Sequence, residues 1–229
     1  MLIHLLELRR RGIQTLVCFA ALFCCFFFLA NPLFQALVSP LLHSLSTQEG
    51  LIATRITSPV FTPLKLAADA AMLLSAPLAL FHCWRFISPG LYQSEQRVLR
   101  GALLCSLLLF AAGVLFCFYF VLPFMFQFFA HALPKGVRYM PDIAYAIDFI
   151  THMLLLFGFC FQVPLLCFML VRLNIVDLLT LRKIRPYVIV SAFIIGMLLT
   201  PPDVFSQITL AVPLCLLYEL GIIFAIYLL

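Results

Sequence analysis

The sequence contains little charge: only 10% of its 229 residues are Asp, Glu, Lys or Arg, whereas 65% are hydrophobic. A water-soluble domain is usually about one quarter charged and about half apolar, so this composition excludes a soluble globular fold. The ten-residue alternating segments of an outer-membrane barrel are also absent. The sequence therefore predicts an integral membrane protein made of several α-helices.

Patterns that would hold a metal, a disulfide framework or a nucleic acid are missing as well. The nine cysteines lie in or at the end of apolar stretches without a Cys-x-x-Cys pair, which favours small packing residues. The five histidines have neither metal-ligand spacing nor a carboxylate partner, so we expect no metal site, cofactor or catalytic centre. The basic residues are scattered over separate loops, which gives no support to nucleic-acid binding.

Six apolar segments predict six membrane spans in one domain, 1–229, because no internal repeat divides the chain. Each span needs about 20 residues to cross a hydrocarbon core about 30 Å thick. The first apolar run ends at Asn31-Pro32 without a small-residue cleavage site, so we expect it to be retained. The predicted spans are about 13–29, 64–86, 98–129, 149–170, 187–199 and 207–229.

The last two spans are predicted to be short. The fifth has 13 residues, with Pro186 expected at its start, and Glu219 interrupts the sixth. Two short neighbouring helices imply a locally thin bilayer or shelter by other helices. Prolines inside the apolar segments predict kinks and a curved bundle, at Pro77, Pro123, Pro164 and Pro213.

The distribution of Lys and Arg predicts the orientation. With six spans, ten of the 14 basic residues fall on the side of both termini, and only Arg55, Lys65, Lys135 and Arg138 fall on the other. Basic residues accumulate on the cytoplasmic side of membrane proteins, so both termini are predicted to be cytoplasmic. The predicted fold class is thus an all-α membrane protein, a curved, cup-shaped bundle of six transmembrane helices.

Two carboxylates near the predicted cytoplasmic surface each allow two interpretations. Glu7, in a short interfacial helix before the first span, can pair with Arg10 or Arg11 for a few tenths of a kcal/mol, or stay available to an incoming cation. Glu95 can support the N-terminus of the third span beside a Ser94 N-cap, or face a guanidinium. The residues alone leave both alternatives open.

Three polar side chains fall within apolar segments. Gln162, in the middle of the fourth span, predicts either an interhelical hydrogen bond or a wet cavity. We expect Asp69 to pair with Lys65 one helical turn away. We expect Glu219 to lie near the cytoplasmic rim.

Five segments occur in an order that carries a family resemblance: His4–Arg9, Ser58–Pro63, Phe86–Tyr92 with Glu95, Arg185–Tyr187 and Leu199–Gln207. Together they resemble TatC, the receptor subunit of the twin-arginine protein translocase. The resemblance implies a six-span, cup-shaped protein in the bacterial cytoplasmic (inner) membrane. It also implies that Glu7 and Glu95 contact the paired arginines of a signal peptide, with Arg9, Phe86, Leu91 and Tyr92 at the same site.

The resemblance further implies partners and a second set of residues. Pro40, Pro59, Phe61 and Asp203 match the structure on the far side of the membrane. Single-span TatA- and TatB-like subunits would dock along the fifth and sixth spans, and copies of the chain would assemble into a receptor complex within the lipid. Folded precursor proteins would cross the membrane using the proton-motive force. Where the family commonly has a glutamate, this chain has Gln162, an amide that cannot titrate.

Two other function classes were compared with this one. A secondary transporter would show an internal repeat and a matched pair of broken helices, and the sequence shows neither. A membrane enzyme would need a nucleophile with a base or a metal constellation, and none is visible. The sequence therefore favours a receptor and translocation subunit.

Overall fold

The structure, a computed structural model, describes residues 2–44, 51–54, 56–87, 95–132, 140–173, 175–199 and 204–227. In these ranges the chain is helical, and the only strand-like pairing is an isolated bridge between Ile52 and Asp142. The elements are α1 (Leu2–Phe28), α2 (Ala30–Ser44), α3 (Ser58–Ile87), α4 (Glu95–Phe116), the π-helical η2 (Cys117–Val121), α5 (Leu122–His131), α6 (Ile143–Cys160), α7 (Val163–Arg172), α8 (Leu178–Leu199) and α9 (Val204–Tyr227).

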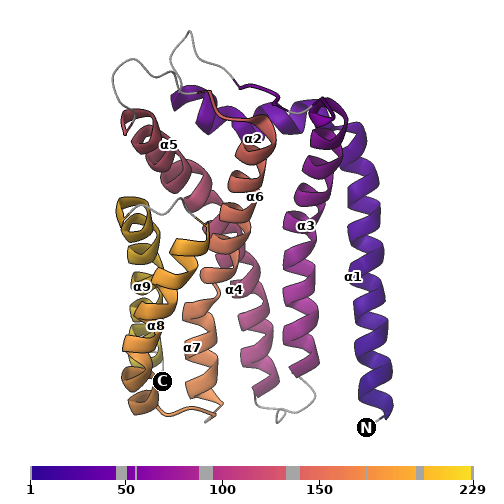
Figure 1. The fold of residues 1–229 in the computed structure, drawn as a ribbon. Helices are drawn as coiled ribbons and strands as arrows, with labels where there is room; N and C mark the ends of the chain where they lie inside the picture. The colour runs from indigo at the N-terminus through magenta and orange to yellow at the C-terminus, as the bar shows by residue number, and fades with distance from the viewer. Residues whose placement is uncertain are drawn as a thin grey trace.

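The helices stand side by side, with α2 lying across one end of the bundle (Figure 1). The main packed pairs are α1 with α3, α4 with α6, α7 with α9, and α8 with α9, while α2 packs on α3, α5 and α6. The largest buried cluster joins α2, α5, α6 and α9 and includes Leu41, Met125, Ile150, Phe157 and Leu210. Figure 1 shows that α1, α4 and α8 begin at the end opposite α2.

Five stretches in the described residues are long and apolar enough to cross a membrane: Arg9–Phe28, Val60–His82, Gly101–His131, Ile143–Arg172 and Gln207–Tyr227. This confirms the prediction of a helical, multi-pass membrane protein. Helix α8, expected as a further span, is not among the five. Its first turns carry three basic residues, Arg182, Lys183 and Arg185, which keep it polar.

Two predicted spans are each built from more than one helical segment. The stretch from α4 to α5 passes through η2, which ends two residues before Pro123. Helices α6 and α7 are separated by a turn at Phe161 and Gln162, two residues before Pro164. Proline lacks an N–H and clashes with the preceding turn, which explains why the regular α-helix is interrupted at these points. Helices α3 and α9 continue past Pro77 and Pro213.

Two sequence-based boundaries were wrong. The residues before the first span form no separate interfacial helix, because α1 is continuous from Leu2 to Phe28. A further helix, α2, lies between the first two predicted spans. Helix α8 begins at Leu178, before Pro186. The carbonyl that Pro186 leaves unbonded belongs to Arg182, an exposed residue, where water can satisfy it.

The last helical pair, α8 and α9, ends well short of the level of α2 (Figure 1). Near this end the two helices approach closely, since a Cβ on Gly196 would lie 3.2 Å from Gln207 Cγ. Gln207 Nε2 donates a hydrogen bond to the Phe193 carbonyl at 2.9 Å. At the other end Arg185 Nη2 lies 2.7 Å from Glu219 Oε2. Polar contacts therefore join α8 and α9 near both ends of the pair.

Candidate functional site

The two predicted ligand carboxylates belong to helix ends at one end of the molecule. Glu7 lies in the first two turns of α1, and Glu95 is the first residue of α4. Figure 1 places these helix ends, together with the end of α3 between them, opposite α2. The side chains of Glu7 and Glu95 lie outside the described residues. The structure thus shows neighbouring helix ends that carry both residues.

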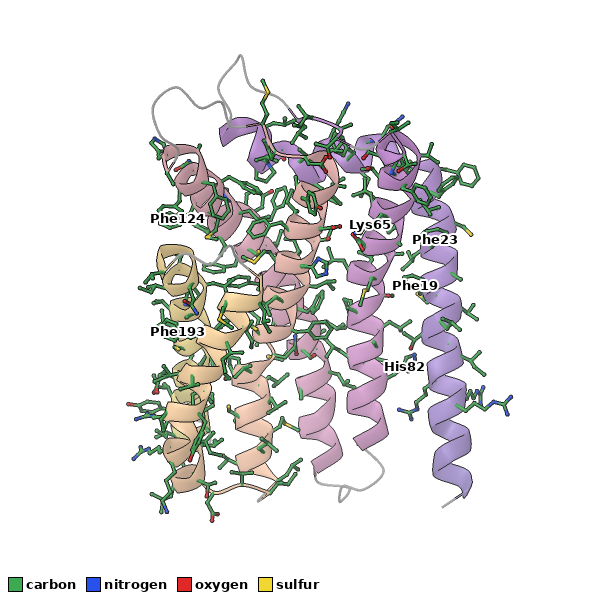
Figure 2. All side chains as sticks on the ribbon, viewed as in Figure 1. Phe19, Phe23, Lys65, His82, Phe124 and Phe193 are labelled. Atoms are coloured by element: carbon green, nitrogen blue, oxygen red, sulfur yellow. The ribbon has the colours of Figure 1, made fainter. Side chains whose placement is uncertain are left out.

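A hydrogen bond fixes α1 against α3 at this end. Arg11 Nη1 donates to the backbone carbonyl of His82 at 3.1 Å. Figure 2 shows His82 on α3, on the side that faces α1. Arg11 lies one turn after Glu7, so this bond holds the turn that carries Glu7 near the last turns of α3. Sequence analysis missed this contact, because its partners are 71 residues apart.

The other predicted residues of this end are only partly described. Arg9 is exposed on α1. Phe86 belongs to the last turn of α3, with its side chain outside the described residues. Leu91 and Tyr92 lie outside the described residues altogether.

Gln162 is buried between helices and forms two hydrogen bonds with one residue. Ser106 Oγ donates to Gln162 Oε1 at 2.7 Å, and Gln162 Nε2 donates to the Ser106 carbonyl at 2.9 Å. This confirms the interhelical alternative, since Ser106 belongs to α4. An amide suits the position because it both accepts and donates. An ionised glutamate would place its charge against the carbonyl oxygen of Ser106.

Glycines let α4 and α6 approach each other beside this contact. A Cβ on Gly113 would lie 2.5 Å from the Phe157 carbonyl oxygen, and one on Gly158 would lie 2.7 Å from Phe110 Cε2. Small residues at helix contacts allow close backbone packing in membrane proteins. Sequence analysis did not identify either glycine, because a glycine in an apolar helix carries no signal of its neighbour.

Charged side chains join α3 and α6 nearer to α2. Lys65 Nζ lies 2.6 Å from Asp148 Oδ1 and 2.8 Å from Asp148 Oδ2. Thr151 Oγ1 lies 3.1 Å from Asp69 Oδ2. The predicted Lys65–Asp69 pair was therefore wrong, because Asp148 on the neighbouring helix lies within reach of the same ammonium group. Glu219, expected near the rim, pairs with Arg185.

The end capped by α2 contains three of the four residues in the second predicted set. Pro40 is buried in α2, and Phe61 is 61% exposed on α3. Pro59 lies in the first turn of α3, with its side chain outside the described residues, and Asp203 lies outside them entirely. The structure brings Pro40 and Phe61 to one end of the bundle.

Asp142 joins α6 to residues 51–54 at this same end. Its carboxylate accepts bonds from Ala144 N and Tyr145 N as the N-cap of α6, and from the backbone N and hydroxyl of Thr54. The Thr54 hydroxyl, followed by the Thr54 backbone N–H, lowers the pKa of Asp142 to about 2. An Asp directly before an apolar run is an N-cap signal that sequence analysis did not use.

The described residues contain no group of three or more His, Cys, Asp or Glu side chains placed to hold a metal. Eight of the nine cysteines, those whose side chains are described, are free thiols. The polar groups described above are thus hydrogen-bonding and ionic contacts between helices.

Comparisons with known proteins agree with the family resemblance. A family model described as Sec-independent protein translocase protein (TatC) matches residues 3–213. A Haemophilus influenzae protein named Sec-independent protein translocase protein TatC is 43% identical, covering 97% of this chain and 87% of that protein. Its namesake from Escherichia coli K12 is 41% identical, covering 97% and 86%. A crystal structure titled twin arginine translocase receptor TatC superposes with a TM-score of 0.86, at 33% identity over 97% of both chains.

Proposed function

The chain belongs to the TatC family of Sec-independent protein translocase proteins, and we propose that it is the subunit that receives twin-arginine signal peptides. The superposition on the twin-arginine translocase receptor over 97% of both chains carries this proposal. The receptor role then requires a surface that captures two arginines. The end of the bundle formed by α1, α3 and α4 is the surface that offers carboxylates.

Glu7 and Glu95 are the proposed ligands of the two guanidinium groups. A carboxylate accepts two parallel hydrogen bonds from a guanidinium, and each charge-assisted bond contributes about 1.5–3 kcal/mol. Micromolar binding requires about 8 kcal/mol, so apolar contacts with the signal peptide must supply the remainder. Phe86, Leu91 and Tyr92 lie in the segment between the two glutamates and are proposed to shape the site, with Arg9 beside Glu7.

The proposed topology has six crossings, with α8 as the additional one and both termini in the cytoplasm. Support comes from the basic residues at the end opposite α2, where α1 begins, α7 ends and α8 begins (Figure 1). Exposed examples at these helix ends are Arg9, Arg10, Arg172, Arg182 and Lys183. Such a bias favours a cytoplasmic location for this end. The end with α2, Pro40, Pro59 and Phe61 then faces the other side of the inner membrane, and the family resemblance assigns Asp203 to that side.

Helices α8 and α9 are the proposed docking site for single-span TatA- and TatB-like subunits. Their outer surfaces are apolar, with Val190, Met197, Leu198, Val212 and Leu216 each about half exposed or more. The two helices have 22 and 24 residues, enough to cross a core about 30 Å thick, so the expectation of two short helices was wrong. The passage of folded proteins along this surface is proposed to be driven by the proton-motive force. Copies of the chain would assemble with these partners into one receptor complex.

Crosslinking of a twin-arginine precursor to the protein in membrane vesicles tests the site. Replacing Glu7 and Glu95 together by alanine should weaken crosslinking at least tenfold while the protein remains inserted. Replacing the two arginines of the precursor by lysines should also weaken it, since an ammonium lacks the planar fork. The matched control is Asp177→Ala, which removes an exposed carboxylate between α7 and α8 and should change nothing. Normal crosslinking by the double variant would remove both glutamates from the site.

A further inference from the structure

A group of four ionisable side chains and one threonine lies between α3 and α6, distant from the proposed peptide site. Lys65 and Asp69 belong to α3, and Asp148, Thr151 and His152 belong to α6. All five lie inside the stretches that are long and apolar enough to cross a membrane. Figure 2 shows Lys65 far from His82 along α3. Charged groups at such positions are costly in hydrocarbon and commonly mark paths for ions or protons.

The charges of this group do not balance if both aspartates are ionised. The ammonium of Lys65 donates a hydrogen bond to Asp148 Oδ2 and lies within ion-pair distance of Oδ1. Asp69, by contrast, has Thr151 as its hydrogen-bond partner. His152 is exposed, and its Nδ1 lies 2.6 Å from the Asp148 carbonyl oxygen. One ammonium therefore faces two carboxyl groups.

The neighbouring helices supply no further cation at this level among the described side chains. Helix α2 and the part of α4 from Gly101 onward carry no charged residue there. The described arginines of α1 lie toward the other end of α3, where Arg11 bonds to His82. The groups that face Asp69 are thus Lys65, Asp148 and His152. An unpaired carboxylate within a membrane span takes up a proton more readily than it stays charged.

Thr151 Oγ1 is within donating distance of three oxygen atoms, one of which belongs to Asp69. Thr151 Oγ1 lies 2.9 Å from the Ile147 carbonyl oxygen, 3.1 Å from Asp69 Oδ2 and 3.2 Å from the Asp148 carbonyl oxygen. A hydroxyl has a single hydrogen, and the carbonyl four residues earlier, which is also the nearest, is its usual acceptor in a helix. The contact with Asp69 then lacks a hydrogen unless the carboxyl group donates one.

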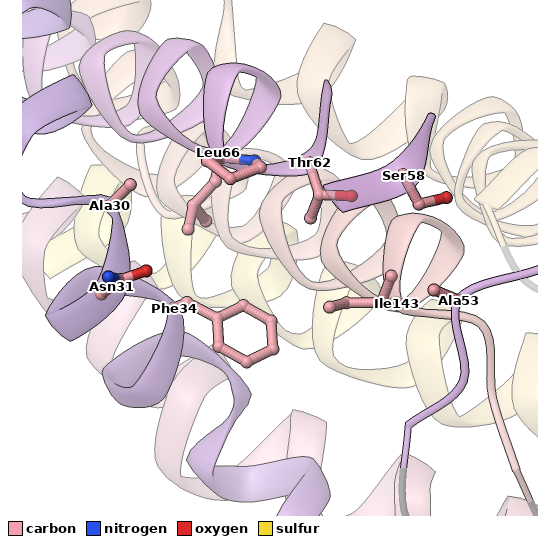
Figure 3. A pocket seen from close by; sticks show the side chains of 9 residues that line it. Ala30, Asn31, Phe34, Ala53, Ser58, Thr62, Leu66 and Ile143 are labelled. Carbon is pink, nitrogen blue, oxygen red and sulfur yellow. The ribbon is translucent and has the colours of Figure 1, made fainter. Parts of the chain in front are cut away.

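A cavity beside Lys65 offers a route to water. It has a volume of about 360 Å³ and is lined by Thr57, Ser58, Phe61, Thr62, Lys65, Ala144 and Ile147. A second cavity of about 240 Å³ shares Ser58 and Thr62 and extends under α2 (Figure 3). Thr62 is only 7% exposed, and its Oγ1 is buried without a hydrogen-bond partner. The first cavity also has Thr57, Ser58 and Lys65 on its otherwise apolar wall, and such polar groups can hold ordered water.

We propose that Asp69 is a proton-binding site of the membrane interior, supplied with protons through this cavity. In the protonated state, the Asp69 carboxyl donates to Thr151 while Lys65 bonds to Asp148. When Asp69 releases its proton to a water molecule, forming a carboxylate and a hydronium ion, Lys65 is shared between the two carboxylates. Lys65 lies one turn before Asp69 on the same helix face, so its ammonium group can reach the second carboxylate by a side-chain movement alone. Proton binding thereby alters the contact between α3 and α6.

Infrared spectroscopy of the full chain in liposomes tests the proposal without any precursor. The carbonyl stretching band of a protonated carboxylic acid should be present at neutral pH and disappear on alkaline titration. Asp69→Asn should remove the band, whereas Asp177→Asn, an exposed residue outside the apolar stretches, should leave it unchanged. Absence of the band in the wild type, or its persistence in Asp69→Asn, would overturn the assignment.

A second variant tests the direction of the hydrogen bond and retains Asp69. Thr151→Val should make the band disappear about one pH unit lower, a tenfold loss of proton affinity, because the neutral acid loses its acceptor. A displacement to higher pH would show that Thr151 donates to a carboxylate, and the proposal would fail. Asp148→Asn should also move the loss of the band to lower pH, since Lys65 is then free to pair with Asp69. Because none of these readouts involves a signal peptide, they are independent of the proposed receptor function.

Discussion

Helix α6 and its continuation α7 contact α4 and α3 by opposite means. Toward α4, glycines bring the backbones together, and the neutral pair Gln162 and Ser106 is buried. Toward α3, the contact is ionic, and the side chains of Lys65 and Asp148 are 50% and 28% exposed. A buried amide, with its oxygen and its nitrogen each hydrogen-bonded, has no charge to gain or lose. A partly exposed ion pair responds to pH and salt, so the first contact fixes the bundle and the second can change.

The close backbone approach on the α4 side predicts the largest effect. Gly113→Ala would place a Cβ 2.5 Å from a backbone oxygen of α6, so it should destabilise the protein by about 3 kcal/mol. Gly101→Ala on the same helix is the matched control, because nothing lies within 4 Å of its added Cβ. Because alanine has a better helix propensity than glycine, Gly101→Ala should be as stable as the wild type or up to about 1 kcal/mol more stable. Thermal unfolding in detergent measures both, and equal midpoints would contradict the close contact.

Replacing Gln162 by a titratable residue in its contact with Ser106 should give the next largest effect on stability. Gln162→Glu places a carboxyl group against the Ser106 carbonyl oxygen, so it should cost about 1–3 kcal/mol when ionised. The variant should be more stable in acid, where the protonated carboxyl can donate to that carbonyl, and should lose stability as the pH rises. Gln162→Leu serves as control, with a smaller loss that does not depend on pH. If the stability of Gln162→Glu did not depend on pH, the two hydrogen bonds between the Gln162 side chain and Ser106 would not both be formed.

The ionic contact on the α3 side should contribute less. Lys65→Met should change stability by no more than about 1 kcal/mol, because half of the lysine side chain is exposed. The effect should shrink at high salt, in contrast to that of Gln162→Leu. Lys183→Met, at an exposed site on α8, controls for the loss of a positive charge. A salt-independent loss of stability above about 2 kcal/mol would instead show that the Lys65 contact is rigid, as the contact between Gln162 and Ser106 is.

The smallest effect concerns Asp142, which lies before the apolar part of α6. Its pKa is lowered from the ordinary value of 3.8 to about 2, first by the Thr54 hydroxyl. The ionised Asp142 carboxylate therefore stabilises the folded state above about pH 4, and this stabilisation is lost as the pH falls toward 2. Because Asp142 is near the surface, we expect faster hydrogen exchange of the Thr54 amide in acid but no global unfolding. In Thr54→Val the Asp142 pKa should move back toward 3.8; an unchanged value would remove this hydroxyl as the cause.

The sequence predicted the apolar helices well, because burial in lipid requires long apolar runs that are visible in one dimension. Helix α2 was missed, since a helix lying across the bundle needs no such run and contains Asn31, Pro32 and Pro40. The Lys65–Asp69 pair was predicted from neighbours within one helix. Asp148, 83 residues away, cannot be recognised as a competitor without the packing of α6.

The candidate site was predicted unevenly for similar reasons. The proposed roles of Glu7 and Glu95 came from family resemblance, because each glutamate also had a local explanation in the sequence. The burial of Gln162 could be inferred from its apolar surroundings, but its partner Ser106 could not, since serine is common in membrane helices. The bond from Arg11 to the His82 carbonyl involves a backbone group, which no side-chain pattern indicates.

Helix α1 packs mainly along a single neighbour, α3, and none of the residues in its most apolar stretch is buried. Most of the surface of α1 therefore faces away from the other helices. Its attachment to the bundle depends on its contact with α3, which ends at the Arg11 hydrogen bond. Detaching it would disturb no other pair of helices. Under mechanical force or denaturant, α1 should be the first helix to detach, while the remaining helices keep their native arrangement.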